Sequence, residues 1–247
     1  HIGDELVERR PSILRARHAP VDVLGGAPPS RCDIAAQLEQ LVLRGLFVRA
    51  DARIDGDLHA RLRRVAVVGA RLFVFDKGGS ARATVLGLGG DHYDLGQEDA
   101  IAFQPLARID EDSMRSWAAE WLAGLLLHEG VVVTPEVKDA LWSALGSLGS
   151  APLEQRTLTG LLVLLQSNPL RQALQPYTLG GPFGRLLDAD ADRLALSDVQ
   201  CFEMEELMHS PAAVLPVLSY LFKRLEERFD GQPTLLISPC SSHALRN

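Results

Sequence analysis

The chain has 247 residues, of which 47% are apolar, and its formal net charge is -7. A chain of this size can bury one sizeable core, and its acidic balance argues against direct nucleic-acid binding through a basic surface. No apolar run reaches the ~20 residues of a membrane span, no signal peptide is visible, and the separated cysteines Cys32, Cys201 and Cys240 favour a reducing compartment over a metal site.

The first 68 residues differ in composition from the rest. They hold half of the arginines, no lysine, and one aromatic residue, Phe47. Asp33 and Asp57 are placed to cap helices over residues 34–44 and 58–64, but prolines and paired glycines interrupt the remainder. We expect an atypical, poorly ordered segment. A shifted reading frame of a GC-rich gene, an insertion or a recombination would each give such a composition, and the start at His1 suggests a fragment.

A buried strand and a glycine turn come next. The apolar run 72–75 is typical of a strand covered on both faces, and it leads into Asp76, Lys77, Gly78, Gly79 and Ser80. Open α/β sheets bind ligands at the carboxyl ends of their strands, where glycines let backbone amides approach an anion. The same residue types are common in ordinary turns. Both interpretations stay open, a ligand site at residues 76–80 or a simple turn.

A short helical crossover is expected over residues 80–87, and a loop after it. The glycines of 87–90 do not complete a dinucleotide fingerprint, because His92 stands where the last glycine is required. Asp91, His92 and Asp94 are metal-ligand types, but neighbouring residues of an extended segment point to opposite faces. A solvated loop is favoured.

Residues 111–190 read as entirely helical. Apolar residues recur at helical spacing over 114–126, and Thr134-Pro135 begins a second helix with a cap and a first-turn proline. A third helix over 157–166 is apolar on most sides and is expected to be buried, and a fourth covers 168–176. Asp188, Asp190 and Asp192 imitate an EF-hand loop, but Arg193 and Val199 occupy its glycine and glutamate positions, which favours a polar turn.

The last third of the chain returns to alternating elements. We expect a strand within 194–204, a long helix over 212–229, and a buried strand over 234–237. Glu203, Glu205 and Glu206 cluster near a helix start, where the helix dipole favours acids, and this explanation is preferred to a catalytic one. The Ser, Cys and His of residues 238–247 lack a supporting nucleophile motif and indicate a frayed tail.

Several of these motifs, in order, resemble a known family. Phe75 to Ser80, Gly89 to Gly96 and Ala102 to Leu106 are similar to the motor domain of the TrbE/CagE family of conjugative-transfer and type IV secretion ATPases. The similarity continues through Trp117-Ala118-Ala119-Glu120-Trp121, Glu154-Gln155-Arg156-Thr157-Leu158, Cys201-Phe202-Glu203-Met204 and Arg224-Leu225-Glu226-Glu227-Arg228-Phe229. It covers roughly residues 69–237.

The resemblance implies an α/β fold, a partial RecA-like P-loop NTPase sheet with a large all-helical insertion. Residues 69–110 and 191–237 would form the core, and residues 111–190 the insertion. It also implies ATP and Mg as cofactors, with any residual nucleotide contact at Asp76, Lys77, Gly78, Gly79 and Ser80. Partners would be other type IV secretion and mating-pair-formation components or further copies of the chain. The place would be the bacterial cytoplasm, peripheral to the inner membrane.

The chain departs from the family at both ends of the resemblance. The P-loop GxxxxGK[ST] needs a lysine for the phosphates and a hydroxyl for magnesium, but Lys77, Lys138 and Lys223 precede Gly, Asp and Arg. The strand at 234–237 should lead into Asp-Glu and leads into Ser238-Pro239 instead. We therefore expect no catalytic residue, no metal ligand and no ATP hydrolysis by this polypeptide alone. The alternative is a non-catalytic interaction module that packs on secretion-motor subunits.

Overall fold

The computed structural model describes residues 69–96 and 101–237, and the features expected at residues 1–68 and 238–247 lie outside these ranges. Four parallel strands form one sheet in the order β2-β3-β1-β4. Their bounds are β1 Arg71–Asp76, β2 Asp91–Asp94, β3 Val199–Glu203 and β4 Thr234–Ile237. All six residues of β1 are buried, as its unbroken apolar run predicted. The expected α/β class with a parallel sheet is confirmed.

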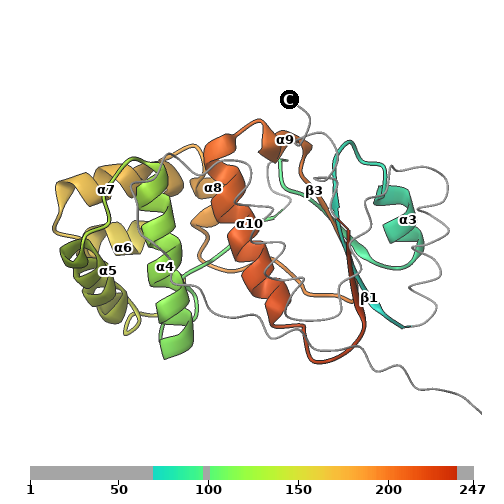
Figure 1. Ribbon diagram of the computed structural model, residues 1–247, viewed down its shortest axis with the longest axis horizontal. Helices are drawn as coiled ribbons and strands as arrows, with labels where there is room; N and C mark the ends of the chain where they lie inside the picture. Colours follow the sequence, from blue (N-terminus) through green and yellow to red (C-terminus); the bar gives the residue numbers. More distant parts are fainter. Residues whose placement is uncertain (1–68, 97–100, 238–247) are drawn as a thin grey trace, which may run out of the picture.

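The two faces of the sheet pack against different helices (Figure 1). One face carries aromatic rings: Phe75 stacks on Phe202 at 5.3 Å and tilts against Phe222 of α10 (Pro211–Glu226) at 5.2 Å. The opposite face is aliphatic and packs on Ala81 and on Val85 of α3 (Arg82–Gly87). Because strand side chains alternate in direction, odd positions of β1 face α10 and even positions face α3.

Residues 111–190 are helical wherever the structure forms regular elements, and these helices gather at the end of the molecule away from α3 (Figure 1). They are α4 Asp112–His128, α5 Pro135–Leu148, α6 Leu158–Leu164, α7 Asn168–Leu174 and α8 Gly184–Leu187, with the short 3-10 turns η1 Leu153–Gln155 and η2 Gln175–Tyr177. Thr134 caps α5 by accepting a hydrogen bond from the Val137 amide, as predicted. The boundaries of the insertion as a separate unit stay a prediction.

Helix α10 joins the helical part to the sheet. The indole of Trp121 in α4 donates a hydrogen bond to the Pro216 carbonyl at 3.2 Å, and its ring stacks on Trp117 at 5.7 Å. Trp117 also contacts the ring of Tyr220 at 6.0 Å. Trp121 is therefore a core residue and Trp117 packs partly buried against the core, in agreement with their place in a leucine-rich stripe.

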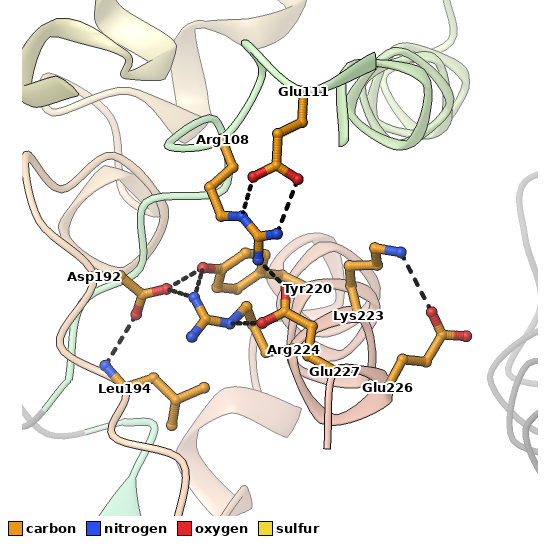
Figure 2. A network of polar contacts seen from close by, with 9 residues as sticks. All are labelled: Arg108, Glu111, Asp192, Leu194, Tyr220, Lys223, Arg224, Glu226 and Glu227. Carbon is orange, nitrogen blue, oxygen red and sulfur yellow. Dashed lines mark hydrogen bonds and ion pairs between the residues drawn. The ribbon is translucent and has the colours of Figure 1, made fainter. Parts of the chain in front are cut away.

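A polar network reinforces the same junction (Figure 2). Asp192 accepts hydrogen bonds from the Tyr220 hydroxyl and from Arg224, the latter at 2.7 Å. Before α4 begins, Arg108 pairs with Glu111 at 2.9 Å and with Glu227, the C-cap residue of α10, at 2.8 Å. The segments that enter and leave the helical part are thus both fastened to α10.

Two local predictions were wrong. Residues 91–94 form strand β2 rather than a solvated loop, because they pair in parallel with β3 and place His92 opposite Cys201. The helix expected over 157–166 is not buried on most sides: in α6 only Leu158 and Leu161 are buried, and Val163 is 79% exposed. Apolar composition alone does not say which side of a short helix has a neighbour.

The aspartates that imitate an EF-hand do not converge. Asp188 is buried and accepts hydrogen bonds from the Thr159 and Leu179 amides, whereas Asp192 faces α10. The expected polar turn is therefore a pair of structural anchors. None of the helices in the described ranges is long and apolar enough to cross a membrane.

Candidate functional site

Three carboxylates line up at the carboxyl ends of adjacent strands. Asp76 of β1 is the register partner of Glu203 of β3, which is in turn the partner of Asp94 of β2. Neighbouring strands lie about 4.8 Å apart, so residues in register on one face are close. This edge is where open α/β sheets bind their ligands, which makes it the candidate site.

Asp76 organises the β1–α3 turn, which comprises residues 77–81. Its side chain is 1% exposed. One carboxylate oxygen accepts hydrogen bonds from the Lys77 amide at 2.9 Å and the Ser80 hydroxyl at 2.6 Å, and the other accepts from the Ala81 amide at 2.6 Å. Burying a carboxylate is costly unless donors surround it, and here the following turn supplies them.

Glu203 reaches the same turn from the neighbouring strand. Its carboxylate accepts hydrogen bonds from the Gly78 amide at 3.1 Å and the Gly79 amide at 2.5 Å, and also from the Glu205 amide at 2.9 Å. Gly78 and Gly79 have φ angles of 88° and 69°, a conformation that favours glycine. Successive amides that point to one side form a concave nest for an anion. In this structure the carboxylate of Glu203 fills that nest.

The structure brings together the backbone of the residues predicted as a ligand site. The Ser80 hydroxyl donates a hydrogen bond to Asp76, and the amides of Gly78 and Gly79 both donate to the carboxylate of Glu203. The side chain of Lys77 is exposed. Sequence reasoning missed Glu203. A signal existed, because Glu203, like Asp76, ends a strand, and parallel strands present their carboxyl ends at one edge.

The arrangement does not fit a triphosphate with magnesium. Phosphate oxygens need free amide donors, and the amides of Gly78 and Gly79 already donate to Glu203. Asp76, Asp94 and Glu203 also make the edge strongly negative. Over residues 69–96 and 101–237, no three His, Cys, Asp or Glu side chains are grouped so that they could hold a metal ion. Nucleotide contact at residues 76–80 stays a prediction, and this geometry of the turn argues against it.

Two other features of the described part, a cavity and a buried thiol, do not form a site. A cavity of about 400 Å³ is lined by residues that include Thr157, Thr159, Arg185, Asp188 and Arg193, but its buried acid is already bonded to backbone amides. The Cys201 thiol is buried in the sheet, and burial raises its pKa, which disfavours the thiolate that a nucleophile requires. The sheet edge remains the candidate.

Comparison with known proteins finds relatives among conjugal transfer proteins. No protein-family profile matches it. The conjugal transfer protein TrbE of Rhizobium radiobacter is 41% identical over 186 residues, which are 72% of this chain and 22% of the relative. A probable TrbE conjugal transfer protein of Sinorhizobium fredii is 38% identical over 174 residues, 68% of this chain and 26% of the relative.

More distant similarity extends to a second group of secretion proteins. The type IV secretion system protein VirB4 of Bartonella henselae is 26% identical over 168 residues, 66% of this chain and 21% of the relative. The structure of VirB4 of Thermoanaerobacter pseudethanolicus matches with a TM-score of 0.56 and 18% identity, over 77% of this chain and 59% of that one. The chain therefore spans about a quarter of the length of the curated relatives that it matches.

Proposed function

Because the chain belongs to the TrbE/VirB4 family of conjugal-transfer and type IV secretion proteins, we propose that it is a partial or degenerate copy of the family's motor that does not hydrolyse ATP on its own. The resemblance assigns the complete motor to powering DNA or protein translocation across the bacterial envelope. This polypeptide would keep the scaffold of that motor without its phosphate chemistry.

The observation that carries the proposal is the occupied nest at the sheet edge. Phosphoryl transfer depends almost wholly on donors and cations placed around the phosphates. The amides of the β1–α3 turn that are best placed for this role are bonded to Glu203 and Asp76. The sequence also contains no GxxxxGK[ST] loop. The chain therefore lacks the P-loop lysine and has no free amide donor at Gly78, Gly79 or Ala81, and phosphoryl transfer needs such groups around the phosphates.

The direct test is phosphate release from MgATP by the purified full-length chain. The expected rate equals that of buffer, with or without EDTA. Turnover that EDTA abolishes would overturn the proposal. A Lys77→Ala variant serves as the control for contamination, because turnover by this chain at residues 76–80 should fall in that variant, whereas a contaminating ATPase would be unaffected.

The alternative is an interaction module, and exposed apolar side chains in the helical part favour it. Leu127, Val132 and Val163 are each more than half exposed. Its partners would be other type IV secretion components or further copies of the chain, at the cytoplasmic face of the inner membrane. Light scattering during size-exclusion chromatography separates the two: an oligomer independent of ATP supports the module, and one that forms only with ATP supports a residual nucleotide site.

A further inference from the structure

We propose that Glu203 is the internal ligand of an anion-binding turn. Its carboxylate takes the place between the Gly78 and Gly79 amides that a phosphate-like anion would otherwise occupy. The inference deepens the proposed function and rests on it in one respect, that no nucleotide displaces Glu203 in the wild-type chain. On this view, the side chain of Glu203 alone keeps external anions from the Gly78 and Gly79 amides.

The geometry of the contact is that of an anion in a nest. Each carboxylate oxygen of Glu203 accepts from one of two successive amides, at 3.1 Å from Gly78 and 2.5 Å from Gly79. Two oxygens on one centre, facing two adjacent N–H groups, reproduce the way in which phosphate is held by glycine-rich backbone. Both glycines have positive φ angles, and in this conformation their amides donate to the carboxylate.

Glu203 is held in this position from three sides. Its backbone is paired in β3, its carbonyl accepts from the Leu95 amide at 3.0 Å, and its carboxylate accepts from the Glu205 amide at 2.9 Å. The side chain is only 7% exposed, so it has lost most of its water and depends on these donors. The carboxylate and the amides therefore hold each other in place.

Removing the side chain should expose what it covers. In a Glu203→Ala variant the Gly78 and Gly79 amides lose their acceptor, while Asp76 still fixes the turn through Lys77, Ser80 and Ala81. The edge also loses one negative charge. Inorganic phosphate or pyrophosphate can then take the vacated position, with the exposed Lys77 side chain nearby in sequence.

Glu205 provides a matched control. Its carboxylate lies beside the turn, since a Cβ built on Gly78 would be 3.9 Å from Oε2 of Glu205. It accepts no hydrogen bond from the two glycine amides, which are both given to Glu203. A Glu205→Ala variant thus removes the same charge from the same neighbourhood and leaves the nest filled.

The experiment measures thermal unfolding of the full-length wild type, Glu203→Ala and Glu205→Ala with increasing pyrophosphate, at an ionic strength held constant with NaCl. Glu203→Ala should start at a lower Tm and rise saturably, by about 3–6 °C at ten times the Kd. Wild type and Glu205→Ala should show no saturable rise. A merely structural role of Glu203 would lower the Tm and create no dependence on the anion.

Amide spectra locate the effect. In ¹⁵N-labelled Glu203→Ala, the Gly78 and Gly79 cross-peaks should shift with pyrophosphate. The inference is overturned if they do not move, if Glu205→Ala responds equally, or if the wild type already responds. If Glu203→Ala does not fold, Glu203→Gln replaces it, because a carboxamide can accept from only one of the two amides. Its glycine cross-peaks must then shift, and ATP turnover remains a separate readout of the proposed function.

Discussion

Two buried carboxylates, Asp76 and Glu203, decide what the end of the sheet can bind. Between them they accept hydrogen bonds from the backbone amides of residues 77, 78, 79, 81 and 205 and from the Ser80 hydroxyl. Hydrogen bonds to charged groups are worth about 1.5–3 kcal/mol each, and buried donors without partners cost a similar amount. The turn and the two acids therefore form one energetic unit.

Asp76→Ala should be strongly destabilising, because it leaves the Lys77 and Ala81 amides and the Ser80 hydroxyl without their acceptor. We expect a loss of about 2–5 kcal/mol in the free energy of unfolding, measured by urea denaturation. Ser80→Ala removes one member of the same cluster and should cost only about 1 kcal/mol. Equal losses in the two variants would show that Asp76 does not organise the turn.

At the other end of β1, the contacts of Arg71 make the stability of the fold depend on pH. It donates to Asp230 at 2.7 Å and 2.9 Å and to Asp198 at 3.2 Å. The hydrogen bond from Arg71 holds the pKa of Asp230 well below its usual value. Since the folded-state pKa is lowered, the stabilisation is fully present above the unfolded pKa of about 4 and is lost as the pH falls below it.

The prediction concerns the difference between wild type and Asp230→Asn. Wild type should have the higher urea midpoint at pH 6, and the two midpoints should converge as the pH falls from 4 toward 2. A difference that stays constant over this range would mean that the Asp230 charge does not matter. Arg108 and Glu111, a surface pair, offer a comparison in which a smaller effect is expected.

Residue-scale prediction from the sequence reached Asp76 but not Glu203. Asp76 stands at the end of an unbroken apolar run, which makes the edge position visible. Glu203 lies just before the start of a helix, where the helix dipole already explains an acidic residue. What the sequence does not contain is the register that sets Glu203 beside Asp76, because strands separated by more than a hundred residues are aligned by packing.

The element that organises packing is α10, which touches the sheet on one side and α4 on the other. Phe222 contacts the aromatic face of the sheet, and the Pro216 carbonyl and Tyr220 contact the tryptophans of α4. Helix stability in proteins comes mainly from such buried faces rather than from propensity. The junction of α4 with α10 is therefore expected to be part of the cooperative core.

Two tryptophan substitutions test this. Trp121 is 7% exposed and bonded to α10, whereas Trp142 of α5 is 45% exposed and lies under the Arg115 guanidinium at 5.6 Å. Trp121→Ala should cost about 3–5 kcal/mol. Trp142→Ala should cost about 1 kcal/mol, near the value of an exposed cation–π contact. Comparable losses on urea denaturation would mean that α4 does not depend on α10.

A second prediction for the junction between the helical part and α10 concerns the polar network of Figure 2. Asp192 and Arg224 are largely buried and 2.7 Å apart, whereas Lys223 and Glu226 on the same helix are 3.5 Å apart and more open to water. A double-mutant cycle with Asp192→Asn and Arg224→Met should give a coupling of about 1–3 kcal/mol. The Lys223–Glu226 cycle should give less than about 1 kcal/mol, and equal couplings would contradict the assignment.

Element-scale prediction from the sequence succeeded where local signals are strong. The cap and proline at Thr134-Pro135 located α5, and the run at 72–75 located β1. It failed for β2, whose Asp-His-Tyr-Asp sequence lacks the usual apolar alternation and becomes a strand only through pairing with β3. It also failed for α6, where an apolar sequence has a neighbour on one side only.

At the scale of the molecule, the structure has a parallel α/β sheet whose edge is built from residues of the motifs that carry the family resemblance, Asp76 and Glu203. The parallel sheet, the helical part and the likeness to a VirB4 structure agree with the class predicted by the family resemblance. The position of α10 between them was not predictable, because it depends on tertiary contacts rather than on periodicity. The chain shares its architecture with the family, and the filled nest supports the proposal that it does not hydrolyse ATP.

The most direct test of this proposal is isothermal titration calorimetry of the purified full-length chain with MgATP. Our account predicts no saturable binding, because the turn amides are already occupied and the surrounding edge is negative. Saturable binding of one nucleotide per chain, lost in a Gly79→Ala variant and dependent on magnesium, would contradict it.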